Sequence, residues 1–203
     1  MLDQLRQPLE EAEVRLSRVH RSTTFPASVT LVGATNPCAC GWHGDREHGC
    51  RCTTTQRQRY WQRLSGPLLD RLDLQLRLER RSAEAVKRCI SAPHRSEHLD
   101  QWNQADTINQ ARQRMQQRNP SGCCNRKLSA GDLKASGRFQ ASALDLWEQL
   151  IGQRGLTTRS GLQLLRVART IADLNNQIEV DAEAVAEASC FRCTDLIRHP
   201  FNQ

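Results

Sequence analysis

Four cysteines in a glycine-rich stretch constrain this chain more than any other feature of its sequence. Residues 34–56 contain four Cys, three Gly and one Pro, and they show no hydrophobic period. Such a segment needs something other than an apolar core to order it. The cysteines form two close pairs, Cys38-Ala-Cys40 and Cys50-Arg-Cys52, separated by nine residues. Two thiol pairs joined by a flexible loop suit the four soft ligands of tetrahedral zinc, so the spacing predicts a structural zinc site.

The alternative is four free or transiently oxidised thiols. His43 and His48 lie in the loop between the pairs and could replace one cysteine as a ligand, although a lone loop histidine is more often solvated. The remaining cysteines are assigned no chemistry: Cys89 is expected to be buried, packing is expected for Cys190 and Cys193, and Cys123 and Cys124 fall in a loop.

The sequence shows neither a secretory signal nor a membrane-spanning segment. Its first residues lack the basic-then-apolar order of a secretory signal, and no apolar run approaches the roughly 20 residues of a bilayer span. An odd number of cysteines, nine, also resists complete disulfide pairing. We therefore expect a cytoplasmic protein without a membrane partner.

The charge is basic and unevenly placed. The formal net charge is +7. Residues 101–140 carry 7 − 2 = +5, whereas residues 141–203 carry 6 − 8 = −2. A basic excess favours a nucleic-acid partner through phosphate neutralisation, and the alternative is a solvated helix face.

The hydrophobic pattern changes character along the chain. Up to about residue 80 it alternates between strand-like and helical segments, and after about residue 82 it is helical throughout. We therefore predict an α/β core fragment over 1–80, a linker over 81–105 and an all-α domain over 106–203. The expected elements are a helix at 2–13, a hairpin at 14–25, strands at 28–33 and 73–79, and helices at 56–64, 106–118, 141–153, 158–174 and 181–190. Gly66-Pro67 is expected to break the helix at 56–64, and Ser129-Ala-Gly-Asp132 is a capping-box-like helix start.

The chain has no motif that would bind a nucleotide by itself. None of its glycines is followed by Lys, so a P-loop is absent, and no apolar strand ends in Asp-Glu to hold Mg²⁺. We expect no ATP hydrolysis by this chain alone. Three polar residues nevertheless stand at element ends: Asn36 after a predicted strand, Arg71 before one, and Arg159 in the first turn of a predicted helix. An Asn-Pro turn and two ordinary surface arginines are the alternative interpretation.

Four segments, taken in order, resemble a known family. They are residues 2–10 (LDQLRQPLE), 35–41 (TNPCACG), 65–71 (SGPLLDR) and 164–174 (LLRVARTIADL). Together they look like the C-terminal part of the Mg-chelatase-like AAA+ ATPases of the ComM/YifB type, which are associated with DNA uptake and branch migration. The resemblance implies the C-terminal strands of a P-loop domain with a hairpin and a cysteine-rich insertion at 38–52, followed by a helical lid. It also implies that the Walker A and Walker B motifs lie outside this chain.

The resemblance implies roles at the nucleotide. Asn36 matches the sensor 1 residue that positions the attacking water, and Arg71 matches the finger that reaches into the neighbouring subunit. Arg159 matches the sensor 2 arginine that couples the lid to the nucleotide. Gly161 departs from the family pattern, because a bulkier residue is usual there.

The resemblance also implies a DNA contact and a metal. The hairpin at 14–25 corresponds to one that points into a central pore in related helicases, so Arg18 is the first candidate for a phosphate contact, followed by Arg15 and Arg21. The alternative is an exposed edge that charge protects from pairing. The four cysteines match the family's cysteine-rich insertion, which supports zinc.

Three hypotheses follow. The first is the sensor and lid portion of a DNA-translocating ATPase that forms a hexameric ring. In the intact protein it would use ATP and Mg²⁺ together with the N-terminal half. The second is a zinc-stabilised nucleic-acid-binding module without a motor. The third is a relative of the magnesium-chelatase ATPase subunit. A G-x-x-x-x-G-K-[ST] motif in the coding sequence immediately upstream would favour the first.

Overall fold

The computed structural model describes residues 2–19, 21–45, 47–78, 80–91 and 97–192, and for residues 97–103 only the backbone. The chain divides into two compact units, one within residues 1–72 and one within 73–193. The protein is mixed α/β and mostly helical, with one small two-stranded sheet among the described residues. None of the described helices combines the length and the apolar character that a membrane span requires. The two units are described in turn.

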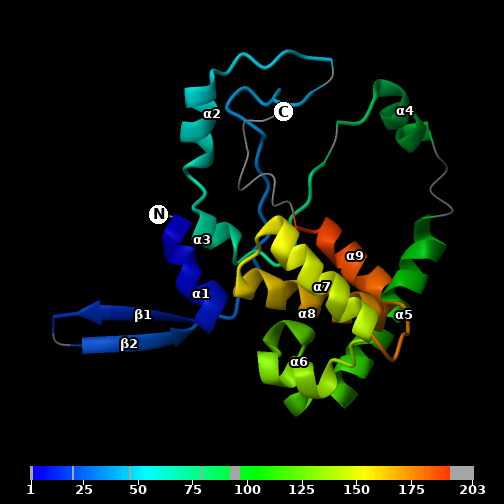
Figure 1. The fold of residues 1–203 in the computed structure, drawn as a ribbon. Helices are drawn as coiled ribbons and strands as arrows, with labels where there is room; N and C mark the ends of the chain where they lie inside the picture. Colours follow the sequence, from blue (N-terminus) through cyan, green and yellow to red (C-terminus); the bar gives the residue numbers. More distant parts are fainter. Residues whose placement is uncertain (1, 20, 46, 79, 92–96, 193–203) are drawn as a thin grey trace. The chain divides into compact units, whose positions relative to one another are not determined.

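The first unit begins with a short helix followed by a hairpin (Figure 1). The predicted hairpin is confirmed: its two strands pair antiparallel, in a register that runs from Glu13 opposite Pro26 to Arg18 opposite Arg21. Two short helices complete the unit. The elements are η1 (Leu2–Leu5), α1 (Arg6–Glu11), β1 (Glu13–Arg18), β2 (Arg21–Pro26), α2 (Thr54–Trp61) and α3 (Gly66–Leu69).

Local capping explains where the two short helices begin. The Thr53 side chain accepts a hydrogen bond from the backbone N–H of Gln56, and the Gln56 side chain accepts one in return, which completes a capping box for α2. The Ser65 side chain caps α3 by accepting from the backbone N–H of Leu68, and Pro67 lies in the first turn of this helix. The predicted break at Gly66-Pro67 is therefore a helix start, because proline at the first helical positions gives up an N–H that has no intrahelical partner.

The first unit has little apolar core. Among its described residues, Cys38 and Leu68 are the hydrophobic side chains that are fully buried. Burial of two side chains is too little to stabilise a unit of this length. Its order must come from caps, polar contacts and the cysteines.

The two strands predicted outside the hairpin are wrong. Residues 28–33 and 74–78 lack strand pairing in the described structure. Val29, Leu31 and Val32 are 43%, 39% and 90% exposed. A strand forms only when a neighbour takes up its backbone hydrogen bonds, and the described part of the chain supplies no neighbour for these segments.

The second unit is a helical bundle built around α8 (Thr158–Leu174). Ten of the seventeen residues of α8 are buried, and it packs against elements on both sides (Figure 1). The apolar stripe predicted from Leu164, Leu165, Ala168, Ile171 and Ala172 is confirmed. The other elements are α4 (Ala83–Ser91), α5 (Glu97–Arg118), η2 (Pro120–Gly122), η3 (Asn125–Lys127), α6 (Ala130–Ser136), α7 (Ala141–Arg154) and α9 (Ala182–Cys190).

Two predicted helix starts are confirmed. Ser129 and Asp132 form a reciprocal capping box at α6. The Asp181 carboxylate accepts a hydrogen bond from the backbone N–H of Ala184 and caps α9.

The cysteines outside the cluster behave differently from the prediction. Cys89 on α4 and Cys190 on α9 are exposed. Both predictions of packing are therefore wrong, since these positions of the two helices face solvent rather than a neighbour. Cys193 lies outside the described residues.

The structure explains why a glycine stands at position 161. A Cβ at this position would lie 2.9 Å from Cδ1 of Ile151 on α7. The Trp147 indole N–H, also on α7, donates to the Gly161 carbonyl at 2.9 Å. The departure from the family pattern therefore marks the close approach of α7 to α8, with no distortion of the helix that carries Arg159.

A buried ionic network holds the second unit together. Asp173 and Arg169 on α8 are both fully buried, and they form an ion pair at 3.1 Å. Arg118 at the end of α5 donates to both carboxylate oxygens of Asp173, and Asn125 donates to one of them at 2.8 Å. Arg169 also donates to three carbonyl oxygens, so every charge in this interior has close partners.

The network yields a stability prediction. Asp173→Asn leaves two arginines without their shared anion in the interior, so we expect the free energy of unfolding to fall by about 3–5 kcal/mol. Urea unfolding followed by circular dichroism measures the change. Asp145→Asn, at an exposed position of α7, is the control and is expected to stay within about 0.5 kcal/mol of the unsubstituted chain. Equal effects of the two substitutions would contradict the role of the network.

Candidate functional site

The four predicted cysteines converge. Cys38, Cys40, Cys50 and Cys52 have Sγ atoms that all lie within 4.8 Å of one another. Three of the separations are 3.3, 3.7 and 3.7 Å. A tetrahedron with Zn–S bonds of about 2.3 Å has edges of about 3.8 Å, so the thiols stand close to the spacing of zinc ligands. All four are free thiols, which leaves them available as ligands.

The pKa values of two of these thiols, Cys40 and Cys52, are shifted in opposite directions. Backbone N–H groups of Trp42 and Arg51 lower the pKa of Cys40 to about 6. The backbone N–H of Cys40 also lowers the pKa of Cys52, but the neighbouring sulfurs of Cys40 and Cys38 together with burial outweigh it and raise that pKa to about 11. A second thiolate beside the first is therefore unfavourable until a cation enters, which is the behaviour expected of a cation-binding group.

The histidines of the loop do not join the group. The His48 ring stacks on Trp42 with centroids 4.2 Å apart, and its Nδ1 lies 3.2 Å from an oxygen of Asp45. His43 is half-buried elsewhere in the loop. Among the described residues, the group that could hold a metal consists of the four cysteines.

The cysteine cluster and α2 fix the segment that carries Asn36. The Trp61 indole N–H donates to the Pro37 carbonyl at 3.0 Å, and the hydroxyls of Tyr60 and Thr35 lie 3.0 Å apart. Asn36 itself is exposed, with its side chain free to meet a ligand. Sequence inspection missed Tyr60 and Trp61, because nothing in a short polar helix indicates which loop it contacts.

Arg71 is held by the first helix of the chain. Its Nε donates to a carboxylate oxygen of Glu10 at 2.9 Å, and one of its terminal nitrogens donates to the Pro67 carbonyl at 2.6 Å. Ser65 in turn donates to Asp3 at 2.5 Å. The two motifs 2–10 and 65–71 are thus joined by side-chain contacts. Glu10 was missed as a partner of Arg71, since the two lie about sixty residues apart.

Arg159 lies in the second unit, in the first turn of α8. Thr157 caps this helix by accepting from the backbone N–H of Ser160. Arg159 is half-buried. Burial lowers the pKa of Arg166, two turns further along the same helix, and the charge of Arg159 adds to this effect while Asp73 opposes it. Arg71 and Arg159 belong to separate units, and each unit is described by itself.

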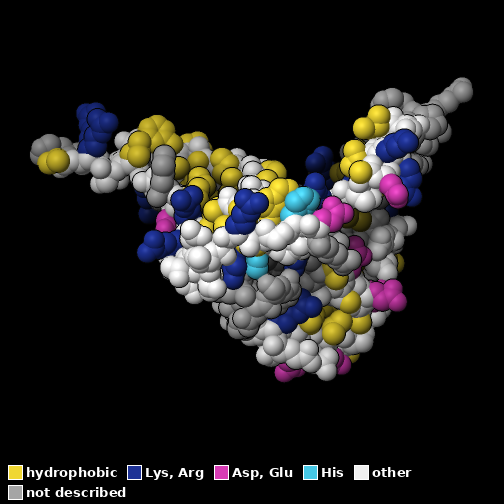
Figure 2. Space-filling model, turned by 90° about the horizontal axis from the view of Figure 1, so that it is seen from above, with side chains coloured by type: hydrophobic (Ala, Val, Ile, Leu, Met, Phe, Trp, Pro, Cys, Tyr) yellow, Lys and Arg dark blue, Asp and Glu magenta, His cyan; other side chains and the backbone are white. Residues whose placement is uncertain are grey.

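The hairpin presents its predicted arginines unequally. Arg18 and Arg21 are exposed and stand opposite each other as the last pair of the ladder. Arg15 instead pairs with Glu13 at 2.6 Å and with Glu11 at 3.8 Å. Dark blue and yellow side chains lie next to each other along this hairpin (Figure 2). Its end therefore carries uncompensated positive charge beside exposed apolar groups.

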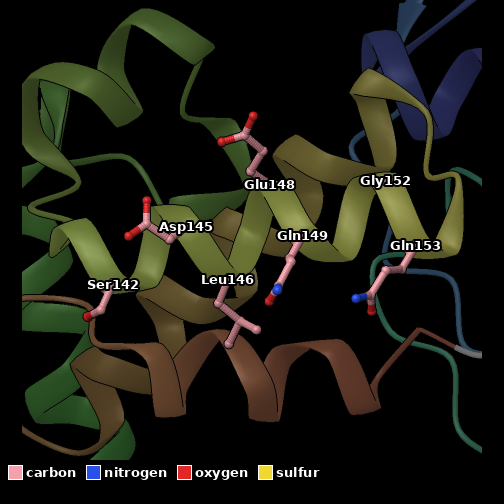
Figure 3. Close-up of a pocket in the computed structure, with 7 residues that line it drawn as sticks. All are labelled: Ser142, Asp145, Leu146, Glu148, Gln149, Gly152 and Gln153. Carbon is pink, nitrogen blue, oxygen red and sulfur yellow. The ribbon is translucent and has the colours of Figure 1, made fainter.

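An open hollow along α7 does not have the chemistry of a nucleotide site. Figure 3 shows Leu146 and Gln149 on the side of α7 that faces α9, with Asp145 and Glu148 on the opposite side. Its lining offers two carboxylates and no cation, so it would repel phosphate. The residues that line it are Ser142, Asp145, Leu146, Glu148, Gln149, Gly152 and Gln153.

Comparison with known proteins covers nearly the whole chain. Residues 1–86 match the family model of the magnesium chelatase subunit ChlI, and residues 100–192 match that of the ChlI C-terminal domain.

Three curated relatives have similar sequences. The protein YifB of Escherichia coli is 32% identical over 196 residues, a protein of Mycobacterium tuberculosis is 34% identical over 199, and the competence protein ComM of Haemophilus influenzae is 30% identical over 192. These alignments cover 97%, 97% and 95% of this chain but 37%, 38% and 36% of the relatives. The chain thus spans little more than a third of the length of the relatives it matches.

The cysteine geometry predicts bound zinc. Protein purified without added metal should contain close to one equivalent of zinc by elemental analysis, and a content below about half an equivalent would contradict a tight site. Cys40→Ser and Cys50→Ser should lose the metal, because each removes one of four thiolate ligands. Cys124→Ser, an exposed cysteine outside the cluster, and His48→Ala should both retain it. Chelation should also shift the emission of Trp61, which contacts Pro37 beside the cluster.

Proposed function

Because this chain belongs to the family of the magnesium chelatase subunit ChlI, we propose that it is the sensor and lid portion of a ring-forming AAA+ ATPase that translocates DNA. In the intact protein, ATP with Mg²⁺ binds between subunits of a hexameric ring. Asn36 and Arg159 act on the nucleotide of their own subunit, and Arg71 acts on that of the neighbour. The observation that carries the proposal is the match of two consecutive family models over the residues that hold these three side chains.

Arg71 is suited to exchange one anion for another. Its fork now pairs with the exposed carboxylate of Glu10. A guanidinium forms the same bidentate, charge-assisted hydrogen bonds with a phosphoryl group, and it keeps its charge throughout. In the ring, we propose that the γ-phosphate bound by the neighbouring subunit competes with Glu10 for Arg71. Binding of that phosphate by Arg71 would then release its contact with α1, the helix that carries Glu10.

The hairpin is suited to contact DNA backbone. Like charges directly opposite each other on a strand pair repel, so Arg18 and Arg21 destabilise the hairpin end on which they stand. A phosphate between them removes that repulsion. Arg15 is a weaker candidate, because Glu13 and Glu11 already neutralise it.

Zinc has a structural role in this proposal. The four thiolates would hold the loop 38–52, and through the contacts of Pro37 and Thr35 with α2 they would fix the segment of Asn36. The metal supplies rigidity here and takes no part in the reaction. A structural site of four cysteines is coordinatively closed, which agrees with such a role.

A zinc-stabilised nucleic-acid-binding module without a motor is the second candidate. The observation that favours it is that the hairpin and the cysteine cluster lie in the same unit, within residues 2–72. Both candidates predict DNA binding, but only the first predicts a response to nucleotide.

DNA binding is tested on the hairpin. We expect Arg18→Ala combined with Arg21→Ala to weaken binding of a DNA oligonucleotide and to reduce the slope of log K against log salt by roughly 1–2, because each lost phosphate contact retains one counterion. Fluorescence anisotropy over a salt series measures both. The matched control is Arg59→Ala together with Arg112→Ala, which removes two exposed arginines of α2 and α5 that lie outside the hairpin. Equal losses in the two double variants would argue for diffuse attraction.

ATP turnover separates the two candidates. The chain alone should show no phosphate release above a buffer blank, since the P-loop is missing from its sequence. When the chain is mixed with a polypeptide that carries the Walker motifs of a relative such as YifB, we expect ATP turnover. Arg71→Ala should reduce the rate of that turnover by about 10³-fold or more. Turnover by the chain alone would refute the expectation that this part of the site is inactive by itself. A mixture that binds DNA but never hydrolyses ATP would favour the module.

A further inference from the structure

The two faces of the hairpin differ in chemistry. Successive side chains of a strand point to opposite faces, and residues that stand opposite each other on paired strands share a face. The other face, which is the more polar one, carries Glu13, Arg15, Ser17, Ser22, Thr24 and Pro26. We call the remaining three pairs the hairpin face; they are Val14 with Phe25, Leu16 with Thr23, and Arg18 with Arg21.

The hairpin face is apolar along most of its length, cationic at its end and free of carboxylates. Leu16 and Phe25 are 54% and 50% exposed. Phe25 is the diagonal neighbour of Leu16 across the strand pair, a separation that an aromatic side chain can bridge. Apolar and basic side chains lie exposed next to each other along the hairpin (Figure 2). The face therefore offers an aromatic ring and two guanidinium groups to the same ligand.

This face is open in the first unit. All six residues of β2 are exposed. A two-stranded hairpin by itself is marginally stable in water, and further strands or a packed helix usually cover its apolar side. Within the described part of the chain, neither Arg18 nor Arg21 has a carboxylate partner. A ligand that buries Phe25 and Leu16 and brings negative charge to the arginines would therefore stabilise the hairpin.

A single nucleic-acid strand has the chemistry that the hairpin face would recognise. Its phosphates match the guanidinium groups, and its unpaired bases present flat faces that stack on an aromatic ring. Phe25 stands four residues from Arg21 along β2, at about 13 Å, so bases and phosphates of one strand can meet different parts of the face. In a duplex the neighbouring base pairs cover those flat faces, which leaves the ring of Phe25 without a stacking partner.

We propose that the hairpin face binds single-stranded DNA, with Phe25 stacked on an unpaired base, Leu16 packed beside that base, and Arg18 and Arg21 on the phosphates. The choice of DNA rests on the proposed function. The division of the face into a part that contacts bases and a part that contacts phosphates rests on the register and the exposure of the hairpin. Phe25 and Leu16 thereby become binding residues, and the substrate class becomes DNA with an unpaired strand.

The two parts of the face differ in their response to salt. Each contact between an arginine and a phosphate releases condensed counterions, so the loss of an arginine lowers the slope of log K against log salt. Phe25 is uncharged, and its loss should weaken binding by a factor that does not depend on salt. The two responses together separate base stacking from electrostatic attraction.

Fluorescence anisotropy of the 203-residue chain with a labelled DNA single strand, and with the duplex of the same sequence, tests the proposal. We expect Phe25→Ala to weaken binding of the single strand about 10-fold, with its salt slope and the binding of duplex unchanged. Phe25→Trp should retain single-strand binding. Phe25→Leu should lose most of it, because leucine keeps apolar area but has no aromatic plane.

A control and a direct signal accompany these variants. Thr24→Ala changes an exposed residue on the other face of the same strand and should leave binding of both DNA forms unchanged. A strand that contains 2-aminopurine should change its emission when the chain binds, and Phe25→Ala should remove that change while Phe25→Trp keeps it. Circular dichroism of each variant separates folding defects from lost contacts, and the Phe25→Trp result with 2-aminopurine tests stacking even where Phe25→Ala unfolds the hairpin.

Three outcomes would overturn the inference. Equal losses of single-strand and duplex binding in Phe25→Ala would assign the ring to a general DNA contact. A dimer of the chain that forms without DNA and dissociates in Phe25→Ala would show that a second copy covers the face. An RNA strand of the same sequence that displaces the DNA at equal concentration would overturn the choice of DNA.

These results remain distinct from the test of the proposed function. Single-strand binding with the expected pattern at Phe25, but without ATP turnover in the mixed system, would leave the hairpin face standing and remove the motor. Turnover together with DNA binding that depends on Arg18 and Arg21 but not on Phe25 would do the reverse.

Discussion

The carboxylate of Asp173 lies in the interior of the helical unit, where a charge is tolerated only with close partners. Arg118 reaches it from α5, Asn125 from η3, and Arg169 from one turn earlier on α8. Three elements therefore meet at one anion, and their relative positions follow from its hydrogen-bonding directions. The same helix carries Arg159 in its first turn and Arg166 two turns later, so the network that holds α8 in place also positions the backbone from which those two side chains extend.

The first unit depends on a different interaction. Because few of its apolar side chains are buried, local caps and side-chain contacts supply its order: Thr53 at α2, Ser65 at α3, and the pairing of Arg71 with Glu10. The cysteine cluster adds to these contacts, because its four thiols converge in a loop that has no core of its own. Metal binding and folding are expected to be coupled in such a segment. If the cluster binds a metal, its removal is expected to affect the segment of Asn36, which contacts α2 through Thr35 and Pro37.

The arginine bias of the sequence has a structural explanation. Only Lys87, Lys127 and Lys134 are lysines, so 29 − 3 = 26 of the basic residues are arginine. Many of these act inside the fold: Arg169 donates to three carbonyl groups, and Arg114, Arg154 and Arg166 each donate to one. A lysine ammonium could not span these acceptors, because it lacks the planar fork. The net charge therefore overstates the cationic surface that is available for nucleic acid. Arg18 and Arg21, which are exposed on the hairpin, make up a larger share of the accessible positive charge than the composition suggests.

Sequence alone determined the features that depend on near neighbours along the chain: the hairpin, the caps at Ser129 and Asp181, the stripe of α8 and the two cysteine pairs. Periodicity and capping are local, so a single sequence contains them. Residues 28–33 and 74–78 show the limit, because their apolar pattern indicates burial but strand formation requires a partner that the described chain does not supply. Only the tertiary structure brought Glu10 to Arg71, Trp61 to Pro37, and Arg126 to Asp73. Such contacts join residues tens of positions apart, and their geometry is decided by how whole helices pack rather than by any spacing along the chain.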